Sequence, residues 1–225
     1  MADEFRSADR STWSISTTAG LLLALVGPFL TYLLIQALYG PVQSPTRILV
    51  ATALHWVNFA AVLFIVVAAE RRPLASIGVR PYRWWILPLG VVAGAFIAVS
   101  SSFLAEFFGL TADKLYATYL QSLSLAMRVL LVITAGVFEE TLYRGYALER
   151  ISILVGSRWL AGAITLLLFT VMHAPAVGWE HLLPVALVGC LVTLLYLWRG
   201  DLVLNIVAHT TVDGVGLLLA PLAGH

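Results

Sequence analysis

Long apolar runs alternate with short polar connections along this chain. A helix needs about 20 predominantly apolar residues to cross the hydrocarbon core of a bilayer. Seven stretches approach that length, at residues 17–39, 48–69, 84–108, 124–140, 159–176, 182–198 and 202–221. The pattern predicts an all-α polytopic transmembrane helix bundle of about seven spans. Eight is the upper count, because residues 140–158 have room for a further helical turn or an interfacial helix.

Composition agrees with a membrane protein and excludes a water-soluble domain. Of the 225 residues, 60% are hydrophobic and only 11% are charged, whereas soluble domains carry about 25% charged residues. The net charge is +1, which offers no basic surface for nucleic acid. The single cysteine, Cys190, excludes an intramolecular disulfide. We expect one integral-membrane domain over residues 1–225, with the lipid bilayer as its partner.

The basic residues predict how the chain lies in the membrane. When alternate connections are assigned to opposite sides, nine Lys and Arg residues fall on one side and three on the other. Arg144 is set aside because it belongs to a motif described below. Cytoplasmic loops of membrane proteins carry an excess of Lys and Arg. We therefore expect a multi-pass protein of the cell membrane with a cytoplasmic N-terminus.

Ionisable side chains inside the apolar runs are the strongest functional signal. They belong to three short motifs, Glu139-Glu140-Thr141-Leu142-Tyr143-Arg144, Phe169-Thr170-Val171-Met172-His173 and His209-Thr210-Thr211-Val212-Asp213. A charged side chain at a bilayer centre costs roughly 2.5 to 3.5 kcal/mol, so such residues commonly mark functional sites. The motifs indicate a functional site within the segment from about residue 134 to about residue 216.

Helical spacing separates the roles of the two glutamates. Residues four apart differ by about 40° around a helix, so Glu140 and Arg144 share a face while Glu139 points about 100° away. A buried carboxylate held by an arginine suits a general base that acts on water. We expect Glu140 to be this base, while Glu139 orients a neighbouring group or binds a water.

The other two motifs add imidazoles and further polar groups. Phe169 shares a helical face with His173, where it would pack beneath the imidazole or wall a substrate pocket. Asn205, His209 and Asp213 follow one another at four-residue spacing and form a polar row. We expect this row to line a cavity.

Two chemistries fit these residues. In the first, His173, His209 and Glu140 hold a divalent metal such as zinc, which activates a bound water. In the second, no cofactor is required: Glu140 and His173 activate water, and His209 with its neighbours stabilises an oxyanion. The sequence leaves both open.

In order and spacing, the three motifs resemble the signatures EExxxR, FxxxH and HxxxN or HxxxD of the CAAX protease and bacteriocin-processing (CPBP) family. This family is also called the type II CAAX prenyl endopeptidase or ABI family. The resemblance covers roughly residues 134–216, whereas residues 1–130 match only in hydrophobic character. It implies a helical intramembrane endopeptidase of metalloprotease-like type.

The resemblance also implies roles for the motif residues. Glu140 and His173 would activate water, supported by Glu139 and Arg144, while His209 and the residue four positions later would bind the oxyanion or a metal. That later residue is Asp213, where the eukaryotic CAAX enzymes have Asn. An ionised Asp repels an oxyanion, so Asp213 must be protonated, metal-bound or paired with His209. We favour the pairing.

Two other functions compete with proteolysis. Intramembrane Glu, His and Asp also line the ion paths of proton- or cation-coupled transporters, and some proteins of this type serve as bacteriocin-immunity or interaction proteins without catalysis. The sequence has no HExxH and no GxSxG motif. We favour an endopeptidase that cleaves membrane-associated proteins or peptides, prenylated CAAX-type proteins included, at or near the cytoplasmic face of the bilayer.

Overall fold

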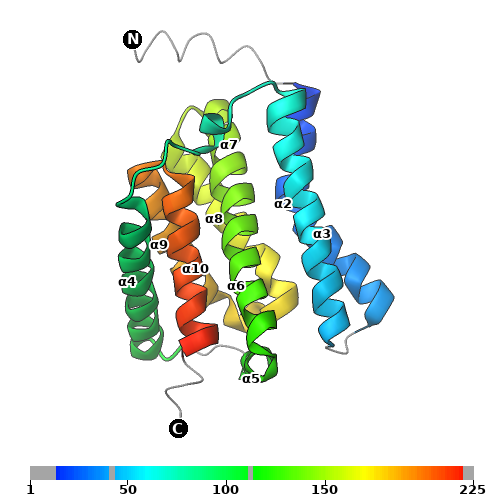
Figure 1. Cartoon of the computed structure of the whole chain (residues 1–225), viewed down its shortest axis with the longest axis vertical. Helices are drawn as coiled ribbons and strands as arrows, with labels where there is room; N and C mark the ends of the chain where they lie inside the picture. The colour runs from blue at the N-terminus through cyan, green and yellow to red at the C-terminus, as the bar shows by residue number, and fades with distance from the viewer. Residues whose placement is uncertain (1–13, 41–43, 111–113, 220–225) are drawn as a thin grey trace.

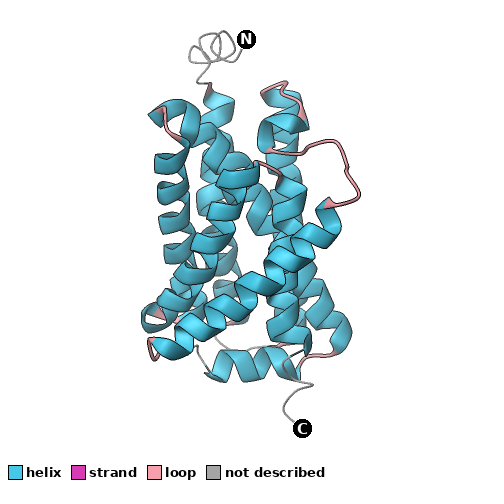
Figure 2. Ribbon diagram, turned by 90° about the vertical axis from the view of Figure 1, so that its left-hand side faces the viewer, coloured by secondary structure: helices cyan, strands magenta, loops and turns pink. Residues whose placement is uncertain are grey.

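A computed structural model describes residues 14–40, 44–110 and 114–219. Throughout these ranges the chain forms helices and connecting loops, with no strand (Figure 2). The elements are α2 (Ile15–Tyr39), α3 (Pro45–Phe64), η1 (Ile65–Ala69), η2 (Leu74–Ile77), α4 (Ile86–Phe107), α5 (Lys114–Ser122), α6 (Leu125–Glu139), η3 (Glu140–Leu148), α7 (Glu149–Val155), α8 (Arg158–Val177), η4 (Trp179–His181), α9 (Leu182–Arg199), α10 (Leu202–Gly214) and η5 (Val215–Leu219). The predicted all-α bundle is confirmed.

Six helical segments of the described chain are long and apolar enough to cross a membrane. They are Ile15–Tyr39, Pro45–Ala69, Ile86–Phe107, Arg158–Val177, Leu182–Arg199 and Leu202–Leu219. The seventh predicted span, at 124–140, lies in α6, which continues without a break through η3 and α7. The further turn expected within 140–158 is the continuation of this same helix. The chain is thus a multi-pass membrane protein. The predicted cytoplasmic location of the N-terminus concerns residues 1–13, which lie outside the described residues.

The helices form two groups that lie side by side (Figure 1). Helices α2 and α3 pair with each other and lie beside the group formed by α4, α6, α8, α9 and α10. Where the groups meet, the Glu70 carboxylate accepts hydrogen bonds from Tyr146 Oη (2.8 Å) and Arg150 Nη2 (2.7 Å). Burial alone would raise the pKa of Glu70, but these hydrogen bonds outweigh it and lower that pKa. This end of the bundle is therefore fastened by an ionised, buried carboxylate.

Glycines let α10 approach its neighbours closely. Gly90 and Gly94 of α4 face α10, and a Cβ at Gly94 would overlap the carbonyl oxygen of Ala208. On the other side, a Cβ at Gly136 of α6 would overlap the Thr210 hydroxyl. Small residues at such contacts allow helix backbones to pack closely within membranes. Helix α10, which carries the third motif, is therefore held tightly between α4 and α6.

Gly94→Ala should lower the melting temperature of the detergent-purified protein. The added methyl group meets backbone, which cannot rotate away, so we expect a loss of about 1–3 kcal/mol, as for an overpacked core. Gly214→Ala is the matched control on α10, because its Cβ would lie 3.9 Å from the nearest side-chain atom. Equal melting temperatures for the two variants would contradict the close contact between α4 and α10.

Candidate active site

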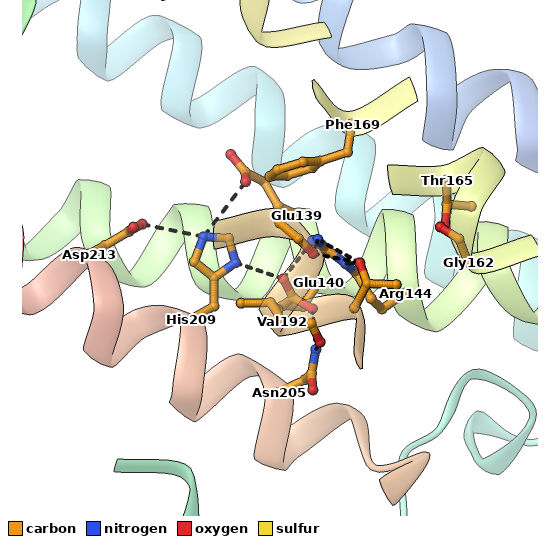
Figure 3. A network of polar contacts seen from close by, with 12 residues as sticks. Glu139, Glu140, Arg144, Gly162, Thr165, Phe169, Val192, Asn205, His209 and Asp213 are labelled. Atoms are coloured by element: carbon orange, nitrogen blue, oxygen red, sulfur yellow. Dashed lines mark hydrogen bonds and ion pairs between the residues drawn. The ribbon is translucent and has the colours of Figure 1, made fainter. Parts of the chain in front are cut away.

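Side chains from all three motifs lie close together (Figure 3). The first lies where α6 passes into the π-helix η3, the second ends near the C-terminus of α8, and the third lies on α10. Ser157 caps the start of α8 through the Leu160 N–H, and Asp201 caps α10 through the Leu204 N–H. These caps satisfy helix-end donors that would otherwise lack partners. The second and third motifs are thus carried by helices with capped N-termini.

Glu140 is fully buried and both its oxygens are engaged. Its Oε1 accepts a hydrogen bond from Arg144 Nη1 at 2.8 Å and lies 2.7 Å from Nδ1 of His209. Its Oε2 accepts a hydrogen bond from Asn205 Nδ2 at 2.7 Å. The side chain has no exposed surface. Glu140 therefore fixes the arrangement of its neighbours and has no free face toward a substrate.

Arg144 supports Glu140 from deeper in the bundle. Its Nη2 donates to the carbonyl oxygen of Gly189 at 3.0 Å and to the hydroxyl of Thr193 at 3.2 Å, both on α9. The guanidinium also lies 4.5 Å from the centre of the Phe169 ring, a cation–π distance. Gly189 and Thr193 belong to no motif, and nothing in their sequence neighbourhood marks them. The arginine joins α6–η3, α8 and α9 around the buried carboxylate.

Glu139 points the other way, toward open space. Its side chain retains 21% of its exposure, and its two oxygens lie 3.8 Å from Nε2 of His173 and 3.9 Å from Nε2 of His209. These separations exceed a direct hydrogen bond and are of the kind that a water can bridge. Figure 3 shows the Glu139 carboxylate and His209 facing one another. Of the two glutamates, Glu139 is the one placed to meet a substrate.

The two histidines are oriented by their Nδ1 atoms. His173 Nδ1 lies 2.7 Å from the carbonyl oxygen of Phe169, and since a carbonyl only accepts, Nδ1 carries the hydrogen. His209 Nδ1 is similarly directed at Glu140. The Nε2 atoms of both rings consequently face Glu139. Asp213 lies beside His209, with Oδ2 3.6 Å from Nε2.

A cavity of about 850 Å³ adjoins these side chains. Glu139, His173 and Asp213 line its inner part, and Tyr143 and Met172 contribute to its wall. The volume falls in the range of pockets that bury drug-sized ligands. A short stretch of peptide therefore has room beside the Glu139 carboxylate.

His55 of α3 lines the same cavity although it belongs to none of the motifs. Its ring stacks on Phe138 at 4.5 Å between centroids, one residue before Glu139. The sequence offered only a lone histidine in an apolar run, which is more often a packing residue. His55 reaches the cavity wall because α3 packs against α6.

The donor set predicted for a metal does not fit. Of His173, His209 and Glu140, the glutamate is turned away from the cavity and bound to Arg144 and Asn205. Among the described residues, no three His, Cys, Asp or Glu side chains converge in a way that could hold a metal ion.

Comparison with known proteins gives one match. Residues 121–215 match the family described as type II CAAX prenyl endopeptidase Rce1-like. No curated protein and no solved structure matches the chain. All three motifs fall within the matched segment, so the resemblance to the CAAX protease family is confirmed there.

Proposed function

From this family relationship, we propose that the chain is an intramembrane endopeptidase that hydrolyses a peptide bond with a water activated at Glu139. The family match supports a hydrolase that acts on peptide bonds. The main support for Glu139 as the base is its open carboxylate, which lies between the Nε2 atoms of two histidines. The sequence alone suggested Glu140 as the base. We transfer that role to Glu139, because a general base must reach the water whose proton it abstracts.

In the proposed reaction, a water lies between Glu139 and His173. Glu139 takes a proton as the water oxygen attacks the carbonyl carbon of the scissile bond, which forms a tetrahedral oxyanion. The C–N bond then breaks, and the proton held by Glu139 passes to the leaving amine. His173 Nε2, held toward Glu139 by the Phe169 carbonyl, orients the water. The products are a carboxylic acid and an amine.

His209 is assigned to the oxyanion. In its imidazolium form, one N–H is directed at Glu140, which leaves the Nε2–H facing Glu139 and Asp213, two residues of the cavity wall. Asp213 beside Nε2 and Glu140 at Nδ1 provide negative charge on both sides of the ring. A preorganised donor aimed at developing negative charge contributes about 2.7–4 kcal/mol in other hydrolases. Asp213 then acts by pairing with the histidine, while Asn205 holds Glu140 in place.

The experiment that tests the proposal is cleavage of quenched fluorescent peptides by the detergent-purified protein. The peptide set should include prenylated and unprenylated apolar sequences, since the substrate class is open. Cleavage that depends on Glu139 supports an endopeptidase. A folded protein that cleaves none of them would overturn the proposal in favour of an ion-coupled transporter or a non-catalytic immunity protein.

Cleavage should persist when a strong chelator is added. We expect unchanged turnover because the residues facing the cavity activate water without a metal in the proposed reaction. The measurement is the initial rate before and after incubation with chelator, with zinc returned in a parallel sample. A rate that falls with chelator and recovers with zinc would instead establish a metal-dependent enzyme.

A further inference from the structure

The two ends of the bundle differ in positive charge. One end is formed by the loop between η1 and α4, the junction of α7 with α8 and the junction of α9 with α10 (Figure 1). Seven arginines belong to it: Arg71, Arg72, Arg80, Arg83, Arg150, Arg158 and Arg199. The opposite end has Arg47, Arg128 and the start of α5 at Lys114. We refer to the first as the arginine end.

The arginine end is closed by its own contacts. Arg80 Nε donates to the Gly200 carbonyl at 2.6 Å. Between this end and the motifs lie fully buried side chains, including Tyr146, Leu148 and Leu202. The described residues that line the cavity include none from the loop at 70–85, from α7 or from the connection at 199–202. The cavity beside Glu139 therefore does not extend to the described residues of the arginine end.

The cavity leads instead to the opposite end. Beyond Glu139, its walls come from the last turns of α2, the first turns of α3, and from α5, η4 and η5. Gln36, Arg47, Gln121, His181 and Leu217 mark this outer part. In Figure 1, α5 and the lower ends of α2 and α3 lie at the end of the bundle opposite α7. Among the described residues, the cavity beside Glu139 therefore extends toward this end of the bundle.

The geometry points to a protease whose active site opens on the extracytoplasmic side of the membrane. The excess of arginine marks the cytoplasmic side by the positive-inside rule, and the cavity opens at the other end. This inference rests on the proposed endopeptidase function and adds the side from which the substrate comes. It reverses the sequence-based expectation of cleavage near the cytoplasmic face.

A substrate class follows from this orientation. The enzyme would act on peptides, or on segments of membrane proteins, that have already crossed the bilayer. A prenylated protein on the cytoplasmic side would meet the closed arginine end. The cavity wall is largely apolar inward of the mouth, with residues such as Ile35, Leu131 and Val212, which suits an apolar stretch of the translocated chain.

Orientation can be measured without any activity by cysteine labelling. Cys190 is the only cysteine in the chain, so Cys190→Ser gives a cysteine-free background. Gly216→Cys places a thiol at the cavity mouth, where an added Cβ meets nothing within 4 Å. Ala75→Cys places one in η2 at the arginine end, where the side chain is exposed. The probe is a membrane-impermeant maleimide applied to intact cells and to permeabilised cells.

We expect Gly216→Cys to be labelled on intact cells and Ala75→Cys only after permeabilisation. The reverse pattern, labelling of both or neither on intact cells, or a Gly216→Cys thiol that stays unlabelled throughout, would overturn the inference.

A second measurement separates the orientation from the activity itself. An impermeant quenched peptide cleaved by the full-length protein is supplied to right-side-out vesicles and to inverted vesicles. Cleavage only in right-side-out vesicles, absent in Glu139→Gln, is the expected result. Cleavage only in inverted vesicles would refute the orientation but keep the endopeptidase. Absence of cleavage on both sides and in detergent, with labelling as expected, would refute the endopeptidase while leaving the side of the cavity established.

Discussion

Glu139→Gln should abolish peptide cleavage and leave the protein as stable as the wild type. The substitution keeps the shape of the side chain but removes the base, and general base catalysis contributes typically about 10²–10⁴-fold to a rate. Stability should change little, because the nearest ionisable partners of Glu139 are 3.8 and 3.9 Å away and its side chain is partly exposed. The measurement pairs initial rates on a cleaved peptide with melting temperatures in the same detergent.

Glu140→Gln is the matched comparison one residue later. Because Glu140 holds Arg144, Asn205 and His209 together, we expect this variant to lose thermal stability as well as activity. Glu140→Gln should therefore melt at a lower temperature than Glu139→Gln, even if both variants cleave slowly. An active Glu139→Gln protein would remove Glu139 from the reaction and return Glu140 to consideration as the base.

Arg144→Met should be the most destabilising single substitution in the site. It leaves the Glu140 carboxylate buried without its counter-charge, and breaking a buried ion pair in this way costs about 3–5 kcal/mol. Arg158→Met is the control. Arg158 also pairs with a glutamate, Glu149, but the Arg158 side chain keeps 43% of its exposure. Exposed pairs contribute about 0–1 kcal/mol. Unfolding followed by heating or denaturant in detergent gives the comparison.

The double variant Arg144→Met with Glu140→Gln tests the reason for the loss. If the unpaired charge is responsible, removing the carboxylate as well should recover part of the stability lost in Arg144→Met. If Arg144→Met had the same melting temperature as the wild type, the Glu140–Arg144 pair would not be what holds η3 in place. A double variant less stable than either single one would place the cost in lost packing against Phe169 and Thr193.

Sequence patterns predicted the helices well because membrane spans need long apolar runs, and these runs are easily seen. The sequence also predicted that the three motifs lie together, because ionisable side chains are costly in lipid unless they pair with other polar groups. The relative angle of Glu139 and Glu140 was predictable too, as neighbours on a helix differ by about 100°. Which of them faces the cavity was not, because that depends on where Asn205 and His209 arrive from α10.

Other parts of the site depend on contacts between distant segments. Gly189 and Thr193 receive Arg144 only because α9 packs against α8 and its neighbours. His55 reaches the cavity because α3 lies beside α6. The direction of the cavity likewise follows from how the α2–α3 pair meets the other helices, which no local pattern specifies.

The π-helix η3 makes the first motif unusually sensitive to chain length. Hydrogen bonds in a π-helix span one residue more than those of an α-helix, and such segments are commonly found at functional sites. Loss of one residue between Glu140 and Arg144 would barely change hydropathy, yet it would leave the wider turns of η3 one residue short and displace the side chains that follow. Arg144 would leave Glu140, and Tyr146 and Arg150 would leave Glu70. In this stretch, a one-residue deletion should therefore be more damaging than most substitutions.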